Sequence, residues 1–285
     1  MLTETEKDLC ASRPNSVSYD RVADLHFLGN YVRRLPVNMA RMMENAHDWE
    51  HLPYVHASSF ASIDLISKGP WGWRAKIGLP GGGDYQLLDL IIDETRHYWV
   101  STVFSGMGTG TEIHTQATEL SGDEIEVDVR FYLPEAPADK SVADFVLNYL
   151  TDQYRVLYDE DLGLMSGRQS ALDDRMARRD ESPGLASVLV GDVSELDPLG
   201  THLVETQAGR FCVRRWRDEW IVHSAICPHM LGPLNEAKLD EHGNITCPWH
   251  GYRFDVATGQ NIGAKCNDLA QAPRLIERNG KLYLD

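Results

Sequence analysis

The sequence lacks the features of a membrane-embedded, secreted or disulfide-stabilised protein. It has no run of 18 consecutive apolar residues, whereas a transmembrane helix needs about 20, so we expect no membrane span. The first 14 residues carry charges where a signal peptide has its apolar core, and we therefore expect a cytoplasmic protein. The 285 residues include only five cysteines, and this small, odd number argues against a disulfide framework.

Basic residues are also scarce. There are 27 Lys and Arg against 43 Asp and Glu, which gives a net charge of −16. A surface of this sign repels phosphate backbones, so we expect no nucleic-acid partner, although it suits docking to a basic patch on a protein. Hydrophobic residues make up 42% of the chain, which is enough for a buried core, and the length favours two domains.

The first two-thirds of the chain predict a curved antiparallel sheet that follows a helix. The first 15 residues are polar and are expected to be loose. Residues 37–50 have helical periodicity, with Asn38 as the N-cap and Pro53 expected to end or distort the helix. Six segments rich in aromatic and β-branched residues then predict strands, with Gly122 in a hairpin turn. These strands are expected at 60–66, 71–79, 85–92, 98–105, 111–120 and 124–132.

A long helix and a second domain follow. The helix is expected at 141–179, and a charged stretch beyond it ends in Pro183-Gly184, which is the best domain boundary. Short strands then predict an all-β domain. We therefore expect an α+β protein with a first domain at 18–180 and a second at 185–285.

Two loops of the second domain each offer one Cys and one His. Residues 227–234 read Cys-Pro-His-Met-Leu-Gly-Pro-Leu, and residues 247–254 read Cys-Pro-Trp-His-Gly-Tyr-Arg-Phe. Two thiolates on one iron and two imidazoles on the other are the ligands of a Rieske [2Fe–2S] centre. A Cys₂His₂ zinc site is the alternative, although zinc loops usually pair like ligands. The candidate ligands are Cys227, His229, Cys247 and His250.

Because of these two loops, residues 185–285 resemble a Rieske domain of the ferredoxin or oxygenase type. The resemblance implies that no disulfide joins the loops, because Gly232 or Pro233 and Trp249 stand where respiratory Rieske proteins carry extra cysteines. The remaining cysteines have no role in this interpretation.

A second group of metal ligands occurs in the first domain. Glu44, Asp48, His51 and His56 follow the spacing E-x₃-D-x₂-H-x₄-H. Asp48 and His51 share a face of a regular helix, and Pro53 can break that helix so that His56 folds back to a shared metal. Two imidazoles and one carboxylate leave positions open on non-haem Fe(II) for O₂ and substrate.

The carboxylate ligand must come from another element. We choose Asp161 on the long helix, with Asp159 and Glu160 as alternatives. The eight-residue gap from Asp161 to Gln169 resembles the spacing that follows the carboxylate ligand in Rieske oxygenases.

Taken together, the chain resembles the α-subunit of a Rieske non-haem iron oxygenase of the ring-hydroxylating type. The resemblance implies a START-like helix-grip fold for the catalytic domain and an all-β Rieske domain. Members usually place the Rieske domain first, whereas here it is last, and this chain is shorter than most.

The resemblance also implies a mechanism and partners. Electrons from NAD(P)H reach the cluster through a separate ferredoxin or flavin reductase and then pass to the mononuclear iron, commonly in a neighbouring subunit of a homotrimer. Asp48 would bridge the centres by accepting hydrogen bonds from His51 and from His229 or His250. The substrate is expected to be a small or medium, largely apolar molecule that is hydroxylated or O-/N-demethylated. Candidate pocket residues are Trp71, Trp73, Tyr98, Trp99, Met107 and Phe131.

Two other functions fit the sequence. The chain could be an electron carrier, with a Rieske domain fused to a hydrophobe-binding START-like domain that holds no iron; the absence of a third carboxylate near His51 and His56 would favour this. It could also be a zinc-stabilised binding module, which would be colourless when purified.

Overall fold

The structure is a computed structural model that describes residues 2–178 and 187–285. The chain forms two compact units, Met1–Met165 and Ser166–Asp285. The boundary expected at Pro183-Gly184 lies outside the described residues.

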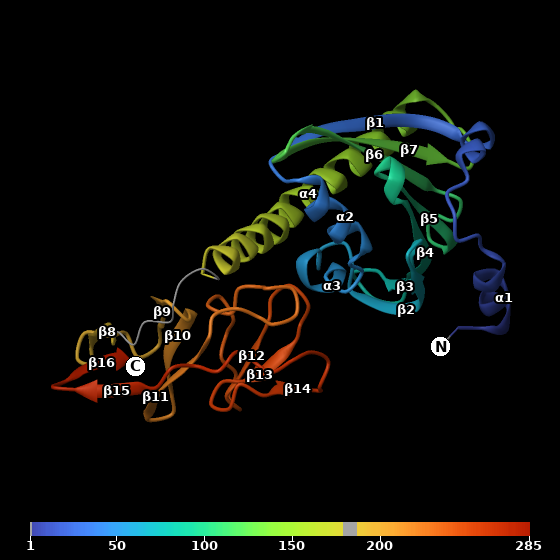
Figure 1. Ribbon diagram of the computed structural model, residues 1–285. Coiled ribbons are helices and arrows are strands. Elements are labelled where there is room, and N and C mark those ends of the chain that lie inside the picture. Colours follow the sequence, from blue (N-terminus) through green and yellow to red (C-terminus); the bar gives the residue numbers. More distant parts are fainter. Residues whose placement is uncertain (1, 179–186) are drawn as a thin grey trace. The chain divides into compact units, whose positions relative to one another are not determined.

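The first unit is built on one antiparallel sheet (Figure 1). Its seven strands follow the order β1-β7-β6-β5-β4-β3-β2, so neighbours in sequence from β2 to β7 are also neighbours in the sheet. The six strands expected from sequence are all present, and the hairpin at Gly122 joins β6 to β7. The strands are β1 (His26–Leu35), β2 (Ser62–Gly69), β3 (Gly72–Gly78), β4 (Tyr85–Asp93), β5 (Tyr98–Gly106), β6 (Glu112–Ser121) and β7 (Glu124–Leu133).

The N-terminal segment is more ordered than its polar sequence suggested. Residues expected to be loose include helix α1 (Glu4–Ser12), which begins with a capping box between Thr3 and Glu6. A 3₁₀ turn, η1 (Tyr19–Asp24), leads to β1, which pairs along its length with β7. Strand β1 was not predicted from the sequence, because this half-exposed edge strand does not alternate cleanly between apolar and polar residues.

Three helices and a turn complete the first unit. Helices α2 (Met39–His47) and α3 (Leu52–Val55) lie between β1 and β2 in sequence, and a 3₁₀ turn, η2 (Glu94–Arg96), joins β4 to β5. The α2–α3 segment packs through Trp49 and Leu52 against Trp73 and its neighbours on the sheet. Helix α4 (Lys140–Ala177) contacts the sheet where the Tyr154 ring lies 5.5 Å from that of Phe131. The sheet and the long helix form the helix-grip arrangement expected for this domain (Figure 1).

In its described residues, 166–178 and 187–285, the second unit is all-β apart from the end of α4. The strands described there form three small antiparallel sheets, β11-β10-β9, β12-β13-β14 and β15-β16-β8. The α+β fold class predicted from sequence is therefore confirmed. The strands are β8 (Val188–Asp192), β9 (Thr201–Thr206), β10 (Gly209–Trp216), β11 (Glu219–Ser224), β12 (Asn244–Thr246), β13 (Arg253–Asp255), β14 (Asn261–Ile262), β15 (Leu275–Arg278) and β16 (Lys281–Leu284).

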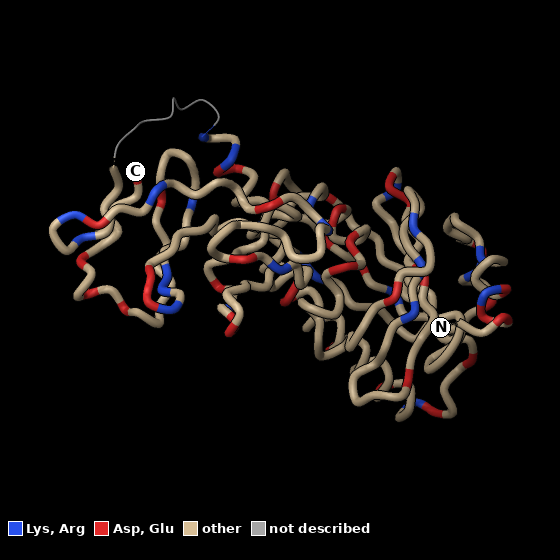
Figure 2. Tube along the Cα trace, turned by 90° about the horizontal axis from the view of Figure 1, so that it is seen from below, with Lys and Arg blue, Asp and Glu red and all other residues tan. Residues whose placement is uncertain are grey.

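Charge and hydropathy of the elements agree with the composition. None of the helices in the described part of the chain combines the length and the apolar character that a membrane crossing requires. Asp and Glu occur in both units, interspersed with Lys and Arg (Figure 2). Most of the excess negative charge belongs to the first unit.

Candidate metal centres

The loop between α2 and β2 carries two of the expected iron ligands. Helix α2 begins at the expected cap, where the Asn38 side chain accepts a hydrogen bond from the Arg41 N–H at 2.9 Å. It ends at His47, well before Pro53. Pro53 instead lies in the first turn of the separate helix α3, where a missing N–H costs little. The expectation that Pro53 would end or distort the first helix was therefore wrong, and the chain turns earlier.

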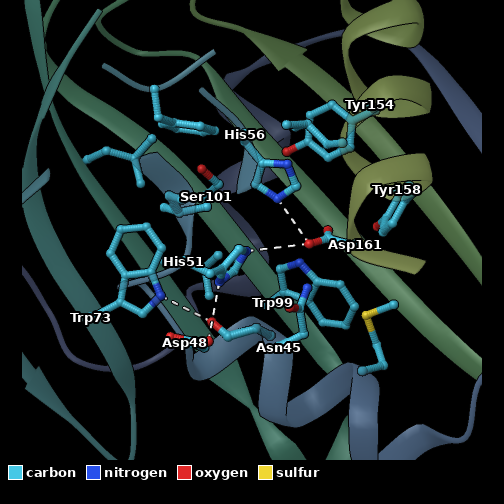
Figure 3. Close-up of a pocket in the computed structure, with 17 residues that line it drawn as sticks. Asn45, Asp48, His51, His56, Trp73, Trp99, Ser101, Tyr154, Tyr158 and Asp161 are labelled. Carbon is cyan, nitrogen blue, oxygen red and sulfur yellow. Dashed lines mark hydrogen bonds and ion pairs between the residues drawn. The ribbon is translucent and has the colours of Figure 1, made fainter. Parts of the chain in front are cut away.

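This short helix places both imidazoles beside α4. His51 and His56 stand at the two ends of α3, and their ring centroids lie 5.1 Å apart. Asp161 of α4 approaches both, with its Oδ1 2.9 Å from His56 Nε2 and 3.4 Å from His51 Nε2 (Figure 3). One ligand atom from each residue lies within 4.8 Å of the others, and all three side chains are buried.

The alternatives to Asp161 occupy other places. Glu160 Oε2 lies 2.7 Å from His56 Nδ1, so it contacts the nitrogen that faces away from Asp161. Asp159 pairs with Arg33 at 2.6 Å and is half exposed. Among these three acidic residues, only Asp161 joins both histidines.

Asp48 lies beside the other nitrogen of His51. As the C-cap of α2, it places its Oδ2 3.5 Å from His51 Nδ1. Carboxylates at the outer nitrogens of two imidazoles are the usual partners of metal-bound histidines, because they fix the tautomer and the ring orientation. The role of Glu160 was missed, although its position next to Asp161 on a helix was the signal available.

Other residues of the sequence pattern do not reach the centre. Glu44 pairs with Arg41 at 3.3 Å, and Gln169 donates to Asp173 at 2.8 Å. His47, one turn before His51, pairs with Glu94 at 2.9 Å.

The electrostatics of the triad favour a bound cation. Burial alone would lower the pKa of His51, but the carboxylates of Asp161 and Asp48 outweigh it and raise this pKa to about 10. Burial alone would raise the pKa of Asp161, but the two imidazoles hold it well below its usual range. A buried carboxylate between two imidazoles thus attracts positive charge, and this donor set suits a divalent transition metal.

An apolar cavity of about 120 Å³ adjoins the triad. Of the residues expected in the pocket, Trp73 and Trp99 line this cavity, and Met107 lines a larger one beside it. Trp71, Tyr98 and Phe131 line neither cavity. Asn45, Tyr154 and Tyr158, which were not expected from the sequence, line the 120 Å³ cavity together with the triad (Figure 3).

The second centre lies in the loops after β11 and β12. Cys227 and Cys247 are buried, and the ring centroids of His229 and His250 lie 4.6 Å apart. Each loop closes on itself through backbone hydrogen bonds, from the Cys227 N–H to Gly232 at 2.9 Å and from the Cys247 N–H to Tyr252 at 2.8 Å.

The two loops come together tightly at their ligands. A Cβ placed on Gly232 would lie only 2.8 Å from the Cys247 sulfur, so only glycine leaves room for that thiol. A hydrogen bond from the Cys227 thiol lowers the pKa of Cys247 to about 5. Two thiols and two imidazoles thus meet at one place, which is the donor set of a Rieske cluster. The described cysteines form no disulfide, as the resemblance implied.

Comparison with known proteins agrees for this unit. Residues 186–273 match the family described as the Rieske [2Fe-2S] domain, so the C-terminal part of the chain is a Rieske [2Fe–2S] domain. This confirms both the expected domain and its unusual C-terminal place, and it favours the iron–sulfur cluster over the zinc site.

The matching segments of curated relatives are short. The chain is 41% identical over 59 residues to flavonoid 8-hydroxylase 2, chloroplastic, of Ocimum basilicum, which covers 21% of this chain and 10% of that protein. It is 43% identical over 44 residues to pheophorbide a oxygenase, chloroplastic, of Oryza sativa subsp. japonica, and this match covers 14% of this chain and 8% of that protein. The chain thus matches about a tenth of the length of these relatives.

Solved structures match parts of this chain. The ferredoxin of carbazole 1,9a-dioxygenase from Nocardioides aromaticivorans IC177 matches 35% of this chain and 96% of that chain, with 24% identity and a TM-score of 0.32. The Zhui aromatase/cyclase from Streptomyces sp. R1128 matches 50% of this chain and 95% of its own chain, with 10% identity and a TM-score of 0.42. The quaternary ammonium Rieske monooxygenase CntA matches 55% of this chain and 42% of its own chain, with 15% identity and a TM-score of 0.41.

Proposed function

We propose that this protein is the terminal component of a Rieske non-haem iron oxygenase. The overall reaction is R–H + O₂ + 2e⁻ + 2H⁺ → R–OH + H₂O, in which the electrons come from a reductase and the protons from solvent. Hydroxylation next to a heteroatom would release an O- or N-methyl group as formaldehyde. A cluster held by Cys227, His229, Cys247 and His250 supplies one-electron transfer, and iron held by His51, His56 and Asp161 supplies O₂ activation.

The approach of Asp161 to His51 and His56 carries this proposal. A Rieske domain alone fits an electron carrier equally well, and such a carrier needs no buried carboxylate between two imidazoles. Here three potential ligands lie within 4.8 Å of one another beside an apolar cavity. This arrangement favours the oxygenase over the carrier.

The chain's own residues prepare the site in two ways. Glu160 and Asp48 hold the Nδ1 atoms of His56 and His51, which leaves each Nε2 directed at Asp161. Trp73, Trp99 and their apolar neighbours line the cavity, and an apolar lining lowers the local dielectric, which strengthens the charge interactions inside it.

Partners and assembly follow from the same proposal. A ferredoxin or flavin reductase carries electrons from NAD(P)H, and its basic surface would meet the acidic surface of this chain. In a homotrimer, Asp48 would accept hydrogen bonds from His51 and from His229 or His250 of a neighbouring subunit. We place the protein in the cytoplasm; the curated relatives above are named as chloroplastic, so imaging of a tagged copy distinguishes these compartments.

Iron analysis with electron paramagnetic resonance (EPR) tests the proposal. Three irons per chain are expected, of which two belong to the reduced cluster and one gives a high-spin ferrous nitric oxide signal. Two irons without that signal would leave only the electron carrier, and a colourless zinc protein would exclude both.

A further inference from the structure

The first unit holds two adjoining chambers of very different size. The chamber at the triad has about 120 Å³, and the one beside it, between α4 and the sheet, has about 750 Å³. We call them the inner and outer chambers. Five residues line both, so the chambers meet there: Phe60, Leu88, Ser101, Tyr154 and Leu157. Two of these, Ser101 and Tyr154, are labelled among the lining residues of the inner chamber in Figure 3.

The inner chamber is too small for a ring beside O₂. A buried apolar cavity of about 150 Å³ holds a single benzene molecule, and the inner chamber is smaller than that. It must also accommodate O₂ at the metal, so the space left for substrate suits a methyl or methylene group. The outer chamber falls within the range of about 300–1,000 Å³ that holds drug-sized ligands, so it can take the rest of the molecule.

The lining of both chambers excludes charged substrates. Among the described residues that line them, none is Lys or Arg. The carboxylates of the outer chamber, Asp84 and Asp152, belong to exposed residues, and Asp152 already pairs with Arg155 at 3.5 Å. In the outer chamber an anion would therefore find no counter-charge and a cation no buried carboxylate, and both are costly. The buried carboxylates of the inner chamber, Asp48 and Asp161, already pair with His51 and His56.

We infer that the substrate is an uncharged, largely apolar molecule larger than one ring, oxidised at a terminal methyl or methylene group. This rests on the proposed function. One oxygen atom enters the terminal C–H bond, and the other leaves as water with two electrons from the reductase and two protons. If that carbon is a methyl group on an ether oxygen, the hemiacetal breaks down to an alcohol and formaldehyde. Dihydroxylation of a ring is excluded because the ring stays in the outer chamber.

A matched pair of fluorescent probes tests the charge and place of binding. N-phenyl-1-naphthylamine is neutral, and 8-anilinonaphthalene-1-sulfonate is the same body with one negative charge. We expect the neutral probe to bind the intact protein at least roughly tenfold more tightly, since an unpaired buried charge costs more than about 1.4 kcal/mol.

Two Trp substitutions on α4 locate that binding. Val146 lines the outer chamber, so Val146→Trp should weaken binding of the neutral probe by at least roughly tenfold. Val142, one turn earlier, is 43% exposed and lines neither chamber, so Val142→Trp should leave binding unchanged. Equal binding of the two probes, or equal effects of the two variants, would overturn the inference.

Fluorine relaxation tests the orientation. The mononuclear site is loaded with Co(II) or, as the diamagnetic reference, Zn(II), with the cluster oxidised. The fluorines of 2-(trifluoromethoxy)naphthalene should relax faster with Co(II) than the ring fluorine of 6-fluoro-2-methoxynaphthalene, because the end group enters the inner chamber. Faster or equal relaxation of the ring fluorine would overturn the inference, as would failure of either compound to bind. If Co(II) does not bind the triad, the proposed function itself fails.

Discussion

Replacement of Asp161 by Asn removes the negative charge between the two imidazoles while keeping the side-chain shape. Asp161 Oδ1 lies 2.9 Å from His56 Nε2 and 3.4 Å from His51 Nε2, and all three side chains are buried. We expect Asp161→Asn to lose the mononuclear iron and to keep the Rieske cluster, because the cluster ligands lie in the other unit.

The same variant should be less stable than the wild type when both are compared after a chelator has removed the mononuclear iron. Removal of one member of a buried ion pair costs about 3–5 kcal/mol. The Asn amide can still hydrogen-bond to His56, so we expect a loss of about 3 kcal/mol in the free energy of unfolding, at the lower end of that range.

The pH dependence of this loss follows from His51. Its pKa is raised to about 10 in the folded protein from about 6.5 in an unfolded chain. The stabilisation is therefore fully present below about pH 6.5 and is lost as the pH rises through 10. The difference between wild type and variant should be largest near pH 6 and should shrink towards pH 10.

Urea unfolding at several pH values, with iron analysis of the untreated proteins, measures both effects. Asp159→Asn is the matched control, since Asp159 is half exposed and pairs with Arg33. The reasoning is refuted if Asp161→Asn keeps all its iron, if it is as stable as wild type at pH 6, or if the difference grows with pH.

Three further changes probe other parts of the molecule. Asp48→Asn should retain the cluster and the mononuclear iron but abolish turnover; product formation at the wild-type rate would contradict the bridge. Gly232→Ala should lower the cluster content measured by visible absorption, because the added Cβ would lie 2.8 Å from the Cys247 sulfur. Gly122→Ala is the control, since Gly122 has open space around it. Equal absorption of the two variants would show that the loop adapts. Asp89 is fully buried between two Arg side chains. Asp89→Asn should lower the free energy of unfolding, measured with urea, by about 3 kcal/mol. A loss below about 0.5 kcal/mol would show that those arginines find other partners.

The sequence was most informative where short-range patterns control structure. Segments rich in aromatic and β-branched residues located β2 to β7, and helical periodicity located α2 and α4. The Rieske loops were recognisable because all four ligands lie in two short segments whose spacing is set by tight turns. The capping box that starts α1 was also readable from Thr3 and Glu6, although the segment was taken as loose.

Other features depend on contacts between distant segments. The pairing of β1 with β7 joins residues about a hundred positions apart, and the sequence of this edge strand alone does not indicate it. The choice among Asp159, Glu160 and Asp161 depends on which face α4 presents to α3. Helical rotation separates neighbouring residues by about 100°, so only the packing of α4 decides which carboxylate meets the histidines.

By itself the sequence therefore determined the ligand types, six of the seven strands of the large sheet and the class of the C-terminal domain, because each is encoded within a few neighbouring residues. Tertiary structure decided that Asp161 lies between His51 and His56, that Glu160 contacts His56 from the other side, and that a small chamber adjoins a large one. These features arise where α3, α4 and the sheet pack together, and no local pattern specifies how closely they approach.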